Sequence, residues 1–205
     1  GESTVPGLFA IGEAAAGAHG ADRLGGMMLV SSQVFGRRAG RTAAARRGTL
    51  APVLSEQVHE VEADAAAFRA GSTAPEELAG RLGDLTWEEL LVERSEAGLK
   101  RAISEIEAMQ LSGVAELGAP DGLSLVRAFE VKNGLVTAEV VARACLERTE
   151  SRGGHYRTDF ETRNDDDWLH ALVVRRSDDG MQLVRHDVDP AWKPRRVDMW
   201  GKKWG

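Results

Sequence analysis

Apolar residues recur at helical spacing through most of the stretch between residues 55 and 150, and this pattern constrains the fold most strongly. It predicts amphipathic helices over residues 55–70, 85–110 and about 123–150. The Asn133-Gly134 pair is a point where the last of these helices is open to interruption. Three or four such helices joined by short loops form an up-and-down bundle, so the sequence predicts a mainly α protein.

Local signals mark the ends of these helices. Gly71 follows the first helix and favours its termination. Thr73 and Glu76 have the spacing of a capping box at the start of the next segment, with Pro75 in its first turn. Gly98 is the expected break within the helix that follows.

The segment before the bundle has a different pattern. Residues 4–12 combine a Pro-Gly turn with an apolar run, which predicts a short buried strand over residues 8–11. Residues 13–26 are rich in glycine and alanine and are interpreted as a tightly packed loop. A helix is expected over residues 27–48, ending at a glycine and carrying arginines in its last turns.

The segment after the bundle predicts a small irregular tail with a β-hairpin. The stretches "LHALVVRR" and "MQLVRHDV" alternate apolar and polar residues, and Ser-Asp-Asp-Gly separates them. We therefore expect a hairpin with its turn near Asp179-Gly180. The preceding "RNDDDW" is interpreted as a solvated turn rather than as an acid–base pair. The terminal "MWGKKWG" predicts no particular element.

Charge and cysteine content exclude several classes of function. The formal net charge of −6 argues against a nucleic-acid partner. One arginine cluster is interpreted as a solvated helix face; its members are Arg37, Arg38, Arg41, Arg46 and Arg47. The single cysteine, Cys145, suggests a reducing compartment and lies in a helical pattern typical of a buried, inert thiol. Without a bilayer-spanning apolar stretch or a signal-peptide pattern, we expect a cytoplasmic location.

The candidate ligand site is the loop "GGMML" at residues 25–29. A glycine loop that enters a helix presents backbone N–H groups and the positive end of the helix dipole, which favour a negatively charged ligand. A tight turn where a helix packs on a sheet explains the same residues equally well.

Three side chains near this loop are candidates for binding. Arg23 suits capture of a carboxylate, with a structural ion pair as its alternative. Glu13 follows the expected strand and is placed to accept hydrogen bonds from hydroxyl groups, unless it is an ordinary exposed glutamate. His19 is either an acid–base group or, as we favour, a hydrogen-bond partner of the local backbone. The other histidines lack metal-ligand spacing, so no metal site is predicted.

Three motifs, in order, resemble the flavoprotein subunits of succinate dehydrogenase and fumarate reductase. "TVPGLFAIGEAAAGAHGADRLGGMMLVSSQVFGRRAG" resembles the close of the family's FAD-binding domain. "RSEAGLKRAISEIEAM" is similar to part of its helical domain, and "LERTESRGGHYRTDFETRNDDDWLHALVV" to its ESRGAHYREDFPxRDDxNWL segment. L-aspartate oxidase and adenylylsulfate reductase belong to the same superfamily. Residues 3–175 carry the resemblance.

The resemblance implies a cofactor and a role for each candidate residue. FAD is the implied cofactor, with Glu13 contacting its ribityl hydroxyls and Met28 and Leu29 donating backbone N–H groups to the flavin. Arg23 is implied to bind a carboxylate of a dicarboxylic substrate, which exchanges hydride with flavin N5. No catalytic residue is assigned within this chain. Met27-Met28 stand where the family usually has Asn-Ser, and Asp22 where it has Asn, which bears on substrate preference.

The resemblance also implies the domain plan and the partners. Residues 1–48 are the C-terminal edge of an α/β FAD-binding domain, 49–150 a helical bundle domain, and 151–205 an extended tail with the hairpin. The dinucleotide fingerprint and the proton-donating capping domain lie upstream in the family. We therefore expect the remainder of the flavoprotein as partner, the chain being part of a cut subunit rather than of a split one.

Alternatives to a succinate–fumarate enzyme stay open at this point. They are an L-aspartate oxidase or adenylylsulfate reductase-like enzyme, and a non-catalytic helical module that docks an iron–sulfur subunit. A peripheral position on the inner face of the membrane is the alternative to a purely cytoplasmic location.

Overall fold

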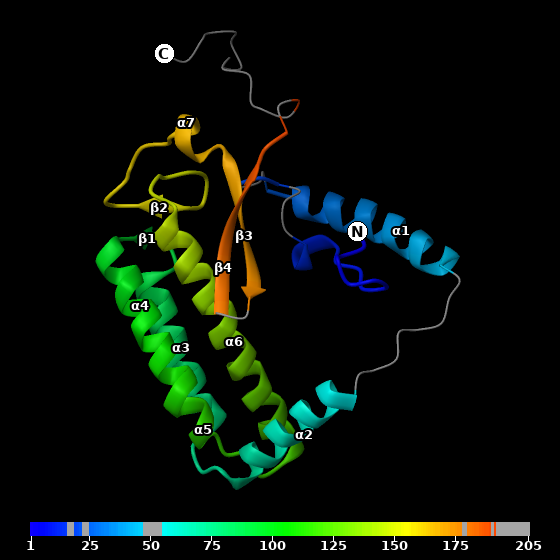
Figure 1. The fold of residues 1–205 in the computed structure, drawn as a ribbon, viewed down its shortest axis with the longest axis vertical. Coiled ribbons are helices and arrows are strands. Elements are labelled where there is room, and N and C mark those ends of the chain that lie inside the picture. Colours follow the sequence, from blue (N-terminus) through cyan, green and yellow to red (C-terminus); the bar gives the residue numbers. More distant parts are fainter. Residues whose placement is uncertain (16–18, 22–24, 47–54, 178–179, 190, 192–205) are drawn as a thin grey trace.

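The computed structural model describes residues 1–15, 19–21, 25–46, 55–177, 180–189 and 191 (Figure 1). Its N-terminal part contains η1 (Gly12–Ala14) and α1 (Met27–Ala45). The central part contains α2 (Ser55–Ala70), α3 (Pro75–Glu89), β1 (Glu93–Arg94), α4 (Glu96–Ala108), the π-helical turn η2 (Met109–Gly113), α5 (Val114–Glu116) and α6 (Gly122–Glu147). The C-terminal part contains β2 (Tyr156–Arg157), α7 (Asp165–Trp168), β3 (His170–Ser177) and β4 (Gly180–Asp187).

Helices α3, α4 and α6 form the predicted up-and-down bundle, and α2 crosses its lower end in Figure 1. Their apolar faces meet in one core, in which Leu99, Ile106 and Leu135 are fully buried. Burial of these faces removes apolar surface from water and is the main term that holds the helices together. The mainly α fold class and the bundle are therefore confirmed.

The start of α6 at Gly122 agrees with the predicted start at about residue 123 and has a clear local cause. The Asp121 carboxylate accepts hydrogen bonds from the amides of Leu123 and Ser124, both at 2.9 Å, and the Ser124 hydroxyl closes a capping box. The helix then runs without interruption through Asn133-Gly134 and ends at Glu147, three residues before the predicted end.

Two predicted boundaries are wrong. The break in the second predicted helix lies at residues 90–95, because Ser95 caps α4 by accepting a hydrogen bond from the Gly98 amide at 3.1 Å. Gly98 thus lies inside α4, where an added Cβ would overlap the Glu89 carboxylate. The Thr73 capping box does not form. Ala74 is the N-cap of α3, and the Thr73 backbone instead bonds to Glu116 and to Gly118.

Gly71 ends α2 as predicted, and the structure shows why no larger residue fits there. The chain passes so close to the Leu117 carbonyl that an added Cβ would overlap its oxygen. Next to it, the Ser72 amide donates to Glu116 O at 3.1 Å, so the two backbones are held together.

We expect Gly71→Ala to lower the free energy of unfolding by about 1–3 kcal/mol, because the paired backbones must separate to admit the methyl group. Gly80→Ala is the matched control, since Gly80 lies in α3 with open space around its Cα. There alanine is expected to raise the free energy of unfolding by about 0.5–1 kcal/mol. Urea unfolding followed by circular dichroism measures both changes, and a shift of the same sign in both variants would contradict this explanation.

The predicted strand over residues 8–11 does not form. Phe9 makes an isolated antiparallel bridge with Glu2, and Ala10 donates to Gly1 O at 2.9 Å. A strand needs a neighbour along its length, and among residues 1–15 only the first few lie beside this run. Val5 and Leu8 are consequently more than half exposed.

Helix α1 is present from Met27 to Ala45, followed by Arg46 as its C-cap. Its last turn contains no basic residue, contrary to the prediction. The predicted stop at residue 48, and with it the predicted domain boundary, falls outside the described residues.

The predicted β-hairpin is confirmed. Strands β3 and β4 pair antiparallel from His170 with Asp187 to Ser177 with Gly180. The centre of the predicted turn, residues 178–179, lies outside the described residues. In addition, β1 and β2 pair in parallel and join the start of α4 to the segment after α6, which the sequence did not indicate.

Candidate functional site

The N-terminal segment places three of the four predicted binding residues on neighbouring elements. Glu13 lies in η1 and is exposed, while Met28 and Leu29 lie in the first turn of α1. Helix α1 packs against η1, which brings the two elements together. Arg23 and its neighbour Asp22 lie outside the described residues, so their predicted roles stay predictions.

Helix α1 begins after a glycine. Gly26 is the N-cap in the left-handed region, with φ of 81°, and no side chain of the described residues forms a capping hydrogen bond there. An added Cβ at Gly25 or Gly26 would meet nothing within 4 Å. Leu29 is 67% exposed beside this end. An open helix N-terminus bordered by apolar side chains fits the edge of a flat ligand that carries negative charge.

One first-turn amide already has a partner within the protein. The Leu29 N–H donates to Gly26 O at 3.1 Å, the tight bond of a helix start. A bond from Leu29 to a ligand therefore requires sharing or replacing this contact.

Within the described residues, His19 contacts α1 and not the local backbone that we expected. Its Nε2 lies 3.2 Å from the Ser31 Oγ, and the Ser31 hydroxyl donates to Met28 O at 2.9 Å. Because the hydroxyl proton is used on Met28, the Ser31 oxygen accepts and His19 Nε2 is the donor. This bond ties the loop to the first turns of α1.

A cavity of about 350 Å³ lies between residues 10–15 and α1. Small side chains and backbone line most of it, with Ser31 and Phe35 on the helix side. Gly12 shapes its wall: its φ is 59°, and an added Cβ would come within 2.7 Å of the Ser32 Oγ. Residues of this size leave room for a ligand to approach the backbone.

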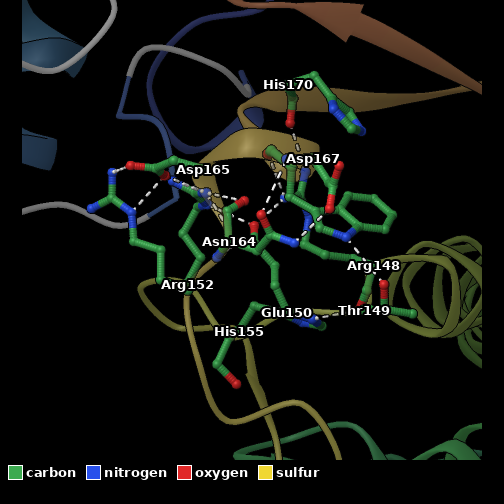
Figure 2. Close-up of polar contacts among 12 residues, drawn as sticks. Arg148, Thr149, Glu150, Arg152, His155, Asn164, Asp165, Asp167 and His170 are labelled. Carbon is green, nitrogen blue, oxygen red and sulfur yellow. Dashed lines mark hydrogen bonds and ion pairs between the residues drawn. The ribbon is translucent and has the colours of Figure 1, made fainter.

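A second polar site, absent from the sequence predictions, lies where α6 ends (Figure 2). Glu150 has 0% exposure. Its Oε1 accepts hydrogen bonds from Arg148 at 2.6 Å and from Arg152 at 2.7 Å. Its Oε2 accepts a hydrogen bond from the backbone N–H of Asn164 at 2.8 Å. Burial alone would raise the pKa of Glu150, but these donors hold it below its usual value, so the carboxylate stays ionised.

Arg157 joins the ends of two bundle helices. Only 1% of its surface is exposed. Its Nη1 donates to carbonyls at the end of α6, including Cys145 O at 2.8 Å, and its other nitrogens bind Asp159 at 2.7 and 2.8 Å. Asp159 in turn accepts from the Glu96 amide at 2.8 Å. A cation therefore lies at the C-terminus of α6 and an anion at the N-terminus of α4, as the helix dipoles favour.

The bonds from Arg157 lower the pKa of Asp159 from 3.8 to about 2, against the opposing effect of burial. A depressed carboxyl pKa stabilises the fold above pH 3.8, and this contribution is lost as the pH falls from 3.8 toward about 2. We expect Asp159→Asn to flatten this part of the stability curve. Urea midpoints between pH 2 and 6 measure it, with Asp84→Asn on the exposed face of α3 as control. An unchanged acid slope in Asp159→Asn would refute the assignment.

These residues explain what "ESRGGHYRTDF" does in this chain. In the sequence this segment is recognisable only as a family motif, although its alternation of acids and arginines is the signal for an internal ion network. The "RNDDDW" interpretation was partly wrong. Asn164 caps the short helix α7, and Trp168 is 5% exposed rather than solvated.

The single cysteine of the chain has the properties of an unreactive thiol. Burial raises the pKa of Cys145, against weaker opposing effects of Arg94, Arg157 and Arg148, as expected of an inert thiol. In the described part of the chain, no three histidine, cysteine or acidic residues are grouped as a metal site. The helices described there include none that is both long and apolar enough to cross a membrane.

A larger cavity, of about 1020 Å³, lies between α3 and α6. Its lining is mostly apolar and includes Leu82, Trp87 and Val141. Two of its charged residues, Arg127 and Glu130, pair with one another at 2.7 Å. The cavity thus lacks converging polar groups of the kind that orient a substrate.

Comparison with known proteins identifies two family models that match this chain. A family model described as "Fumarate reductase flavoprotein C-term" matches residues 79–198, and one described as "FAD binding domain" matches residues 1–29. A fumarate reductase (CoM/CoB) subunit of Methanothermobacter marburgensis is 38% identical over 186 residues, covering 86% of this chain and 33% of the relative. L-aspartate oxidase of Caulobacter vibrioides is 37% identical over 161 residues, or 78% of this chain and 26% of the relative.

A solved structure is similar over most of the chain. The Mycobacterium smegmatis Sdh1 complex in the apo form superposes with a TM-score of 0.80 at 31% identity, covering 90% of this chain and 33% of that one. The chain thus spans about a third of the length of the first relatives it matches.

Proposed function

Because this chain belongs to the fumarate reductase flavoprotein family and matches its C-terminal part, we propose that it is the C-terminal portion of an FAD-dependent oxidoreductase that interconverts succinate and fumarate or a similar dicarboxylate. The observation that carries this proposal is the open start of α1. There an uncapped helix end, two glycines with free space and an exposed Leu29 lie in and beside the segment that matches the FAD-binding model.

The residues fit the edge of a flavin in chemistry and size. Glu13 is exposed and free to accept hydrogen bonds from the ribityl hydroxyls, while the first turn of α1, with Met28 and Leu29, faces the ring edge. The helix dipole there favours the negative charge of a reduced flavin. When bound, FAD supplies a centre that accepts or donates a hydride.

The substrate is proposed to lie beside Arg23. A guanidinium binds a carboxylate through two parallel hydrogen bonds, which fixes the orientation of a small dicarboxylic acid as well as its position. The glycines that follow leave the space a substrate needs next to the helix start. The proton for fumarate reduction is proposed to come from the capping domain of the complete protein, as the family resemblance implies. No group of this chain is proposed to deliver it.

Partners follow from the part of the flavoprotein that this chain represents. The exposed apolar residues of the N-terminal segment, among them Val5, Val30 and Val34, suit a contact with the remainder of the FAD-binding domain. An iron–sulfur subunit is proposed as the electron partner, and a cytoplasmic or inner-face peripheral location stays a prediction. We propose that this chain has three structural parts: residues 1–48, 49–150 and 151–205.

A related reaction is the second candidate, favoured by the similarity to an L-aspartate oxidase over 78% of the chain. Steady-state assays of the complete flavoprotein with fumarate, succinate and L-aspartate decide between the two. The proposal expects fumarate or succinate turnover to exceed that of L-aspartate by at least 100-fold. Faster turnover of L-aspartate would overturn the dicarboxylate assignment.

A non-catalytic docking module is the remaining alternative. An absorbance scan of the purified complete protein tests it together with the cofactor. Flavin bands in proportion to protein support the proposal, whereas a colourless folded protein that binds no added FAD would support the module.

A further inference from the structure

The attachment of the β3–β4 hairpin to the bundle is built around one buried tryptophan. The guanidinium carbon of Arg148 lies 5.0 Å from the centre of the Trp168 ring and that of Arg185 4.9 Å. The ring of His170 lies 5.0 Å from it, tilted by 32°. Trp168 Nε1 donates to the Thr149 hydroxyl at 3.1 Å. Two cations and a histidine therefore surround the same aromatic ring.

These contacts connect the base of the hairpin to the end of α6. Arg148 follows α6 and donates to His170 O at 2.6 Å and Trp168 O at 3.1 Å. From the other side, Arg185 of β4 reaches Glu147 at 3.6 Å. An isolated two-stranded hairpin is marginally stable in water, so the hairpin depends on this attachment.

His170 is the group within this cluster whose ordinary pKa, 6.5, lies nearest to neutral pH. Its Nε2 is buried and has no hydrogen-bond partner. Around it lie Arg148 and Glu150 from the segment after α6, and Arg185 and Asp187 from β4. Asp187 is the residue that pairs with His170 in the hairpin. Burial, then Arg148 and Arg185, lower the pKa of His170, while Asp187 and Glu150 oppose them.

We propose that His170 is a proton-sensitive latch, which holds the β3–β4 hairpin on the end of α6 while neutral and releases it when protonated. A proton on the ring adds a third positive charge to a site that already holds two guanidiniums around one tryptophan. The buried Nε2–H then also lacks an acceptor. Release removes both costs by bringing the imidazolium into water.

The direction of the pH effect follows from linkage. The attached ring binds fewer protons than a released one, whose ordinary pKa is 6.5. The attachment is therefore at full strength above about pH 6.5 and weakens as the pH falls below that value.

Hydrogen–deuterium exchange of the complete protein between pH 8 and 5, corrected for intrinsic rates, tests the latch. We expect the protection of β3 and β4 to fall at least fivefold relative to that of α6 as the pH drops. His170→Gln should remove this pH step, and His186→Gln should keep it, because His186 is exposed on the same hairpin. A parallel change in hairpin and α6, or a step that survives in His170→Gln, would overturn the proposal.

A second measurement covers the case in which His170→Gln does not fold. The exchange rate of the histidine C2 proton, read by mass spectrometry, reports the titration midpoint of each histidine in the unmodified protein. We expect a midpoint for His170 below 6.5, and a higher midpoint for His170 in the Arg185→Gln variant. This variant should fold, because the Arg185 side chain is 59% exposed. A midpoint at or above 6.5, or no response to Arg185→Gln, would refute the latch.

Discussion

Replacing Glu150 with glutamine is expected to lower the free energy of unfolding by about 3–5 kcal/mol, because it removes the carboxylate charge that two largely buried guanidiniums share. Glu150 is fully buried and is the shared acceptor of Arg148 and Arg152. Glutamine keeps the shape of the side chain, but its amide cannot neutralise these two guanidiniums, each about 15% exposed. Because domains are stable by only about 5–15 kcal/mol, the variant approaches the limit of folding.

Chemical denaturation at neutral pH measures this loss, with Glu130→Gln as the matched control. Glu130 makes the same kind of ion pair, with Arg127, but on the exposed face of α6. Exposed pairs contribute about 0–1 kcal/mol, so the control should be nearly neutral. If the two variants lost equal stability, the buried network would not have the role assigned to it.

The second large effect is expected on catalysis. Arg23→Lys in the complete flavoprotein should lower kcat/KM for fumarate by about 100-fold, because a lysine ammonium cannot replace the paired hydrogen bonds of a guanidinium on a carboxylate. Flavin content should stay near normal, since Arg23 is assigned to substrate and not to FAD. Steady-state assays measure kcat/KM for fumarate, and the flavin-to-protein absorbance ratio measures the flavin content. The two measurements together distinguish an effect on substrate binding from an effect on FAD binding.

Arg81→Lys serves as control because Arg81 is exposed on α3, far along the chain from the helix start at Met27. Loss of FAD in Arg23→Lys with unaltered turnover per bound flavin would assign Arg23 to the cofactor. Unchanged kinetics and flavin content would remove it from the site altogether.

Patterns within single elements made much of the fold predictable. The apolar spacing along residues 55–70 predicted α2 with its correct bounds. The same kind of spacing predicted that α6 continues through Asn133-Gly134. The alternation in the two C-terminal stretches gave the hairpin. In each case the side chains that decide the structure are neighbours in the sequence.

Features that depend on distant parts of the chain were not predictable. The pairing of β1 with β2 joins residues about 60 positions apart, Glu93 with Tyr156 and Arg94 with Arg157. Arg157 caps α6 from outside the helix, and Glu150 is buried by partners on both sides of it in the sequence. Charged residues of this kind look like surface residues until the fold surrounds them.

The candidate site was predictable to the extent that its geometry is local. The uncapped start of α1 and its glycines are as the sequence suggested, whereas the Ser31 partner of His19 and the bond from Leu29 to Gly26 required the structure. The role of Arg23 rests on family resemblance and on the chemistry of its side chain.

The most direct test of this account is an experimental structure of the complete flavoprotein with FAD and fumarate bound. We expect the flavin ring edge to lie against the first turn of α1 at Met28, with the Arg23 guanidinium within hydrogen-bonding distance of a fumarate carboxylate. An Arg23 bonded to a protein carboxylate, with side chains covering the start of α1 and the flavin elsewhere, would contradict it.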